Sequence, residues 1–159
     1  QSTQEEDVEV TLLAKAIARI SEGSYEDVSP VVSDGDRKGR LLGRYGFHST
    51  DPMVVKAVGA IEGGQEWLDS LAKGVNPEKM ERYFPVAVQE QILSALLSQK
   101  LEQAKTEIDP QTGEAFVGSR LIERVAQKYA FGDGAKIDGA SGSETESIQA
   151  FGEKVRDNY

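Results

Sequence analysis

The sequence predicts a mainly α-helical single domain with a small extended or β patch around residues 41–47. Apolar residues recur at spacings of three and four along most of the chain, as on the buried face of a helix. Clusters of glycine and proline separate these stretches, and only residues 41–47 combine β-capable residues without helical spacing. A length of 159 residues suits one core. We therefore divide the chain into a polar lead segment, residues 1–11, and one domain, residues 12–159.

The first half of the chain contains three predicted helices. The first spans residues 8–20, with an apolar stripe that includes Leu13, Ala16, Ile17 and Ile20, and we expect this stripe to pack against a long helix that follows Pro85. Residues 29–39 contain one proline and two glycines and predict a loop. A second helix is expected to begin at Asp51-Pro52, since proline is favoured at the first helical position. A short third helix over residues 65–73 carries Trp67, for which a core position is favoured over sugar stacking.

The second half predicts more helix and two turns. A brief helical turn follows residues 76–78, and the long helix runs from Pro85 to about residue 108. Its expected buried side is apolar: Val86, Val88, Ile92, Leu93, Leu96, Leu97, Leu101 and Ala104. Residues 109–113 predict a turn, and Ser119 is expected to cap a helix over residues 121–129. Residues 132–142 predict a glycine-rich loop before a terminal helix over residues 144–158.

Composition excludes several classes of function. A formal net charge of −9 argues against nucleic acid as a partner, because phosphate binding requires clustered Lys and Arg. No run approaches the roughly 18 apolar residues of a membrane span, and no signal peptide is visible. With no cysteine and a single histidine, His48, the sequence offers no thiolate or multi-histidine metal site. We therefore expect no cofactor and no metal.

A set of short motifs follows one order along the chain. Residues 17–47 join a helix end at Glu22, a polar loop and the tripeptide Gly43-Arg44-Tyr45. Similar ordered matches follow at residues 76–78, 88–91, 124–135 and 151–159. In this order and spacing, the chain resembles the lytic transglycosylase branch of the lysozyme-like superfamily, especially the type found in phage virion proteins. The resemblance covers roughly residues 12–159 and implies a lysozyme-like fold.

The resemblance also implies a reaction. Lytic transglycosylases cleave peptidoglycan glycan strands with one glutamate as acid and base, while the C6 hydroxyl of the sugar attacks internally and leaves a 1,6-anhydro-muramyl product. Glu22 is the candidate catalytic acid. A hydrolytic lysozyme would need a second acid, for which Asp34 or Asp36 could be proposed.

The position of Glu22 leaves alternatives open. In one alignment the family motif has lost a glycine and Glu22 is functional. In the other, Glu22 and Ser21 have exchanged places, and Glu22 points about 100° around the helix from the cleft. A solvated glutamate at a helix end is the simplest structural interpretation.

The resemblance further implies substrate-binding roles for Ser24, Tyr25, Arg44, Tyr45 and Tyr129. Packing at an element junction is the alternative for Tyr45 and Tyr129. Two departures favour an inactive relative: Gly46 replaces a glutamine that hydrogen-bonds substrate in the family, and Phe131 is inserted within the segment 124–135, which contains Tyr129.

The sequence thus predicts a peptidoglycan lytic transglycosylase domain. The alternative is a catalytically inactive, lysozyme-like structural or interaction protein. In either case we expect peptidoglycan glycan strands and other proteins of a larger assembly as partners. The expected location is a virion or an extracytoplasmic compartment, the periplasm or cell envelope.

Overall fold

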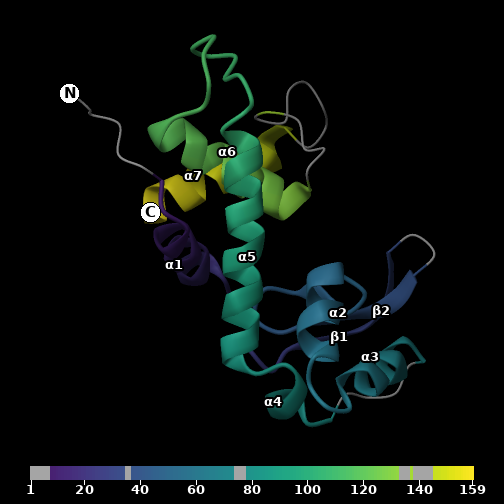
Figure 1. Cartoon of the computed structure of the whole chain (residues 1–159). Coiled ribbons are helices and arrows are strands. Elements are labelled where there is room, and N and C mark those ends of the chain that lie inside the picture. The colour runs from purple at the N-terminus through teal and green to yellow at the C-terminus, as the bar shows by residue number, and fades with distance from the viewer. Residues whose placement is uncertain (1–7, 35–36, 74–77, 133–136, 138–144) are drawn as a thin grey trace. The chain divides into compact units, whose positions relative to one another are not determined.

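The protein is mainly α-helical with one small antiparallel sheet, as the sequence predicts (Figure 1). The structure is a computed structural model and describes residues 8–34, 37–73, 78–132, 137 and 145–159. Among these residues it forms seven helices and three strands: α1 (Val10–Ile20), β1 (Val28–Asp34), β2 (Arg37–Leu42), β3 (Phe47–His48), α2 (Pro52–Gly59), α3 (Gly64–Ala72), α4 (Met80–Tyr83), α5 (Val86–Ala104), α6 (Gly118–Phe131) and α7 (Thr145–Asn158).

The chain divides into two compact units, and each is described by itself. The helical unit comprises residues 1–20 and 94–159, and the sheet unit comprises residues 21–93. The boundary in sequence falls within α5, so the first two turns of this helix belong to the sheet unit. In the part of the chain described, no helix is both long and apolar enough to cross a membrane.

In the helical unit, α7 packs against both α1 and α6. The main partner of α1 is therefore α7, not the long helix that we expected from the sequence. Two hydrogen bonds join the ends of these elements: the Glu9 amide donates to the Tyr159 hydroxyl at 3.0 Å, and Arg19 donates to the Asn158 carbonyl at 2.8 Å. Leu13, Ala16 and Ile17 are buried as predicted, whereas Ile20 is only half-buried.

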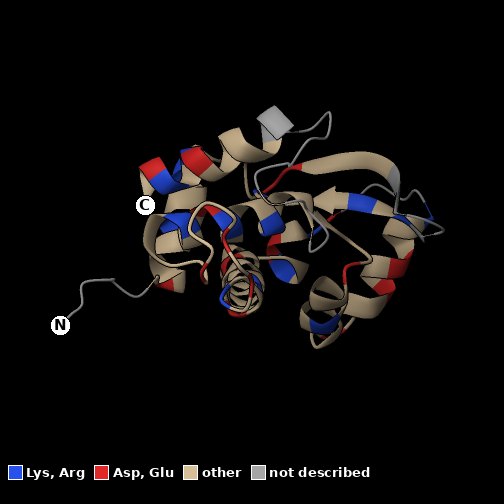
Figure 2. Ribbon diagram, turned by 90° about the horizontal axis from the view of Figure 1, so that it is seen from above, with Lys and Arg blue, Asp and Glu red and all other residues tan. Residues whose placement is uncertain are grey.

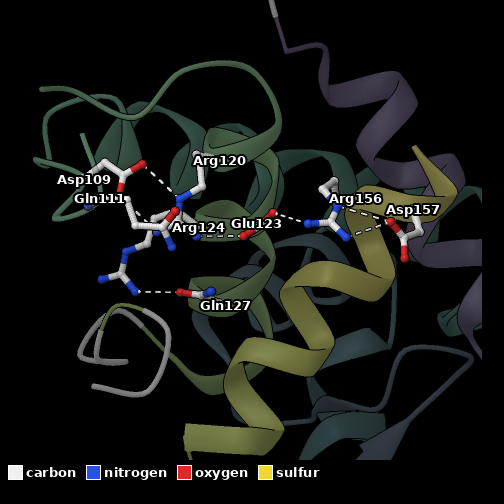
Figure 3. A network of polar contacts seen from close by, with 8 residues as sticks. All are labelled: Asp109, Gln111, Arg120, Glu123, Arg124, Gln127, Arg156 and Asp157. Carbon is white, nitrogen blue, oxygen red and sulfur yellow. Dashed lines mark hydrogen bonds and ion pairs between the residues drawn. The ribbon is translucent and has the colours of Figure 1, made fainter. Parts of the chain in front are cut away.

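The buried face of α6 carries charged residues that pair with their neighbours. Asp109 accepts two hydrogen bonds from Arg120, at 2.9 and 3.0 Å, and Glu123 accepts one each from Arg120 and Arg156, both at 2.7 Å (Figure 3). Acidic and basic residues also lie next to one another in the last turns of α7, the helix that ends beside the C-terminus (Figure 2). The pairs hold charges that would be costly to bury alone.

The sheet unit has the strand order β1-β2-β3, with both pairs antiparallel. The pairing of β1 with β2 joins Val28 to Leu42 and Val31 to Arg40, with an irregularity between these two pairs. At this irregularity the Ser29 hydroxyl accepts a hydrogen bond from the Leu41 amide at 2.8 Å. The Ser29 side chain thus accepts from a backbone amide at the point where the pairing of β1 with β2 is interrupted.

The strands correct our prediction of a loop at residues 29–39. Pro30 lies in β1, which is an edge strand, and an edge position tolerates proline because its missing N–H interrupts no interior ladder. Gly39 is required by a close approach: a Cβ there would lie 2.2 Å from the Ser49 hydroxyl oxygen. Two of the three residues that suggested a loop, Pro30 and Gly39, therefore belong to the hairpin, and the third, Gly35, lies outside the described residues.

The helices of the sheet unit follow the predicted signals closely. Asp51 caps α2, and its carboxylate accepts from the Met53 amide at 2.9 Å. Trp67 is buried, as predicted, and its indole N–H donates to the Glu78 carbonyl at 2.7 Å. The core of this unit consists of Leu42, Phe47, Val54, Val58, Trp67, Leu68, Leu71, Phe84, Ile92 and Leu93.

Several predicted details differ from the structure. Val86, expected in the buried side of α5, is 49% exposed, and α5 ends at Ala104. Ser119 lies inside α6, whose N-cap is Val117. The predicted polar lead includes a buried residue, Val8, and the start of α1. Residues 1–7, Asp36 and most of the predicted loop at residues 132–142 lie outside the described residues.

Candidate functional site: an arginine and two tyrosines beside an open groove

The candidate site lies in the sheet unit, at an open groove of about 510 Å³. The groove follows the irregular end of the β1-β2 hairpin and the turn that leads into β3. It is lined by Asp27, Val28, Ser29, Leu41, Gly43, Arg44, Tyr45 and Gly46. Two predicted substrate-binding residues, Arg44 and Tyr45, are among them.

Two glycines shape the turn that carries Arg44 and Tyr45. Gly43 and Gly46 have φ angles of 78° and 66°, values that residues with a Cβ rarely adopt. The Gly43 amide donates to the Asp27 carbonyl at 2.7 Å, and the Gly46 amide donates to the Gly43 carbonyl at 3.3 Å. The turn is therefore closed on itself and attached to the other wall of the groove.

A buried glutamine on α5 holds this turn in place. The side chain of Gln89 is fully buried and accepts from the Arg44 amide at 3.0 Å. It also donates to the carbonyl oxygens of Tyr25 and Phe84, both at 2.9 Å. A Cβ at Gly43 would lie 2.2 Å from the Gln89 side-chain oxygen, so glycine is also needed for this approach.

Arg44 lies against both predicted tyrosines. Its guanidinium carbon is 5.3 Å from the ring centroid of Tyr25 and 5.9 Å from that of Tyr45, within the range of cation-π attraction. The guanidinium also donates to the Tyr25 hydroxyl at 3.2 Å. Three residues from two separate segments of the chain thus form one cluster.

Glu90, the residue after Gln89 on α5, completes the cluster. One carboxylate oxygen, Oε2, accepts from the Tyr25 hydroxyl at 2.9 Å and from the Tyr45 hydroxyl at 2.5 Å. Burial of Tyr45, followed by its hydrogen bond to Glu90, raises the pKa of the Tyr45 phenol well above 10. Tyr45 therefore keeps its proton at neutral pH and donates it to Glu90.

The residues that follow α1 place Ser21, rather than Glu22, against the turn at residues 43–46. The Ser21 hydroxyl donates to the Arg44 carbonyl at 3.2 Å. Gly23 approaches the same carbonyl so closely that a Cβ would lie 2.3 Å from its oxygen. The side chain of Glu22, between these two contacts, is exposed.

Three of the predicted substrate-binding residues, Ser24, Tyr25 and Tyr129, are not part of the groove lining. Ser24 is exposed; its hydroxyl donates to the Glu26 carboxylate, and its amide donates to Asp27 at 2.8 Å. Tyr129 is half-buried on α6 and belongs to the helical unit. For the second acid proposed for hydrolysis, Asp34 ends β1 opposite Arg37, and Asp36 lies outside the described residues.

We did not predict a site role for Gln89 or Glu90 from the sequence. One signal was available: Gln89 is three residues before Ile92 and four before Leu93, so it lies on the buried face of an otherwise apolar stripe. A polar residue at such a position needs hydrogen-bond partners. Which partners it meets depends on tertiary structure.

The described residues contain no group of three or more His, Cys, Asp or Glu side chains placed to hold a metal ion. Comparison with protein-family models, with curated proteins and with solved structures gave no match.

Proposed function

We propose that this chain is a lysozyme-like domain that acts on the glycan strands of peptidoglycan and holds the strand in the groove of the sheet unit. One observation carries the proposal. Tyr25, Arg44 and Tyr45, which the family resemblance implies as substrate-binding residues, lie together, and Arg44 and Tyr45 line the groove.

The chemistry of the groove suits a sugar chain. Aromatic rings pack against the apolar faces of sugars, and a guanidinium donates hydrogen bonds to their hydroxyl, ether and amide oxygens. A volume of about 510 Å³ lies within the range of small-molecule sites. Because the groove is open, a polymer can pass along it.

In this proposal Glu22 is the single acid and base of a lytic transglycosylase. It donates a proton to the leaving glycosidic oxygen and then accepts the proton of the attacking C6 hydroxyl, so that a 1,6-anhydro-muramyl end forms. Glu22 lies between Ser21 and Gly23, both of which contact the Arg44 carbonyl. Its main chain is thereby attached to the turn that lines the groove.

The second candidate function is strand binding without cleavage, in a structural or interaction protein. A specific observation favours it: Ser21 contacts the turn at residues 43–46, whereas the Glu22 side chain is exposed. Gly46 also offers no side chain where the family has a substrate-binding glutamine. Either function suits a component of a virion or of an envelope-penetrating assembly outside the cytoplasm.

An assay on purified peptidoglycan sacculi tests both candidates. Turbidity reports cleavage, and co-sedimentation reports binding, for the wild type, Glu22→Gln and the exposed control Glu62→Gln. If Glu22 is the acid, only Glu22→Gln loses lysis, and it still sediments with the sacculi. Sedimentation of all three proteins without lysis identifies the binding function. A wild type that neither binds nor lyses sacculi overturns the proposal.

A further inference from the structure

The Glu90 carboxylate is bound by both tyrosines of the candidate site. Its Oε2 atom accepts hydrogen bonds from the Tyr25 and Tyr45 hydroxyl groups, at 2.9 and 2.5 Å, while Glu90 itself is absent from the groove lining. Glu90 is half-buried, and Gln89 beside it fixes the main chain at Tyr25 and Arg44. The carboxylate is therefore placed to act on the groove through other residues.

The direction of these hydrogen bonds determines what the groove presents. A tyrosine hydroxyl has one proton and accepting lone pairs. Because Tyr45 donates its proton to Glu90, its oxygen remains available only as an acceptor. Tyr25 also donates to Glu90 and accepts from Arg44 at 3.2 Å. Glu90 is therefore the final acceptor of a chain of hydrogen bonds that runs from the Arg44 guanidinium through the Tyr25 hydroxyl.

We propose that Glu90 is a positioning residue of the groove: by accepting hydrogen bonds from the hydroxyl groups of both tyrosines, it holds Tyr45 as a hydrogen-bond acceptor and Arg44 as a donor for a bound strand. The ligand class is a glycan whose hydroxyl or amide N–H groups meet Tyr45 and whose oxygens meet Arg44. This inference rests on the proposed function and deepens it.

The positioning role makes a prediction that simple packing does not. If Glu90 acts through the Tyr45 hydroxyl, removing the carboxylate and removing the hydroxyl damage the same interaction, so their effects on affinity do not multiply. Glu90→Gln keeps the shape of the side chain but removes the charge of the acceptor, so its amide oxygen accepts both hydroxyl hydrogen bonds more weakly than the carboxylate does. Tyr45→Phe removes the hydroxyl while Glu90 stays in place.

Calorimetric titration of the full chain with N-acetylchitotetraose measures this coupling. We expect Glu90→Gln and Tyr45→Phe each to raise Kd by about fivefold, as for the loss of one net hydrogen bond. The double variant is expected to bind about as weakly as either single variant, and Glu62→Gln to bind like the wild type. Wild-type affinity in Glu90→Gln, or fold-changes that multiply in the double variant, would overturn the inference.

An alkaline ultraviolet titration without glycan separates this inference from the proposed function. In the wild type, Tyr45 should resist ionisation until the chain unfolds, because burial and then Glu90 raise the pKa of its phenol. In Glu90→Gln the contribution of Glu90 to this raised pKa is lost while burial remains, so tyrosine ionisation should begin at a lower pH than in the wild type, and Tyr45→Phe should abolish this difference. Identical titration curves would overturn the positioning role whatever the glycan result. A wild type without affinity for glycan would overturn the proposed function and the role of Glu90 in the groove. The titration would still test the hydrogen bond between Tyr45 and Glu90, because it needs no glycan.

Discussion

The side chain of Gln89 accepts a hydrogen bond from the backbone amide of Arg44 at 3.0 Å, across 45 residues of sequence. The same side chain donates to the carbonyl oxygens of Tyr25 and Phe84. One buried amide on α5 thus joins three segments of the sheet unit. The candidate site depends on it, because Tyr25 and Arg44 are both held through their main chains.

Replacing this amide should destabilise the protein strongly. Gln89→Ala leaves one buried and two partly buried main-chain groups without this partner and opens a cavity, and we expect a loss of about 3 kcal/mol in the free energy of unfolding. Urea denaturation measures it. The matched variant Gln91→Ala changes an exposed glutamine on the same helix and should stay within about 0.5 kcal/mol of the wild type. Equal stability of the two variants would contradict the role of Gln89.

Gly43 and Gly46 form a second matched pair. Both have positive φ, so alanine costs about 1–2 kcal/mol in backbone strain at either position. A Cβ at Gly43 would also lie 2.2 Å from the Gln89 side-chain oxygen, whereas a Cβ at Gly46 would meet no atom within 4 Å. Gly43→Ala should therefore lower the melting temperature clearly more than Gly46→Ala. A similar drop in both would show that Gln89 moves aside without cost.

Stability should also depend on acid pH through Asp109 and Glu107. The hydrogen bonds from Arg120 lower the pKa of Asp109 below its ordinary 3.8, despite opposing burial. For Glu107, burial alone would raise the pKa, but Arg124 and Lys128 outweigh it and lower the pKa below 4.5.

Because both carboxyls have lower pKa values in the folded state, the unfolded state binds more protons in acid. Their contribution to stability is complete above the ordinary values and is lost as pH falls through the lowered ones. Unfolding free energies measured from neutral pH to below pH 3.8 should fall accordingly. Asp109→Asn should flatten this dependence, while Glu114→Gln, an exposed change in the same turn, should leave its slope intact. If Asp109→Asn showed the same pH dependence of the unfolding free energy as the wild type, Asp109 would not contribute to that dependence.

The helices were predictable because their signals are local. Asp51-Pro52 indicates a capped helix start, and the apolar spacing of Leu13, Ala16 and Ile17 indicates a buried helix face. Both the cap and the buried face are present in the structure. The β1-β2 hairpin was not predicted, because a proline such as Pro30 indicates a loop unless its strand is known to lie at the edge of a sheet. Edge position is a property of the whole sheet.

The site was predictable only in part, for the same reason. Arg44 and Tyr45 share one tripeptide, so their proximity is local. Their attachment to Tyr25, Gln89 and Glu90 depends on contacts between segments far apart in the sequence. The sequence also left the orientation of Glu22 open between two alignments, and a contact from Ser21 to the Arg44 carbonyl is visible only in three dimensions.

If Glu22 is the acid, the product of cleavage identifies the reaction. Internal attack by the muramyl C6 hydroxyl leaves fragments lighter by one water than hydrolysis products. Mass spectrometry of a sacculus digest should show these anhydro ends, and Glu22→Gln should abolish them. Reducing-end muramic acid as the sole product would indicate a second acid and a hydrolytic mechanism.

Co-sedimentation of the Tyr45→Ala variant with purified sacculi tests the central claim most directly, because both candidate functions need the groove to bind glycan. We expect the wild type to sediment with sacculi and Tyr45→Ala to bind at least about tenfold more weakly, since the ring and its hydroxyl are both lost. A matched change outside the groove, Tyr83→Ala, tests whether any lost tyrosine has this effect. Wild-type protein that remains in the supernatant, or Tyr45→Ala that sediments as fully as the wild type, would contradict the account.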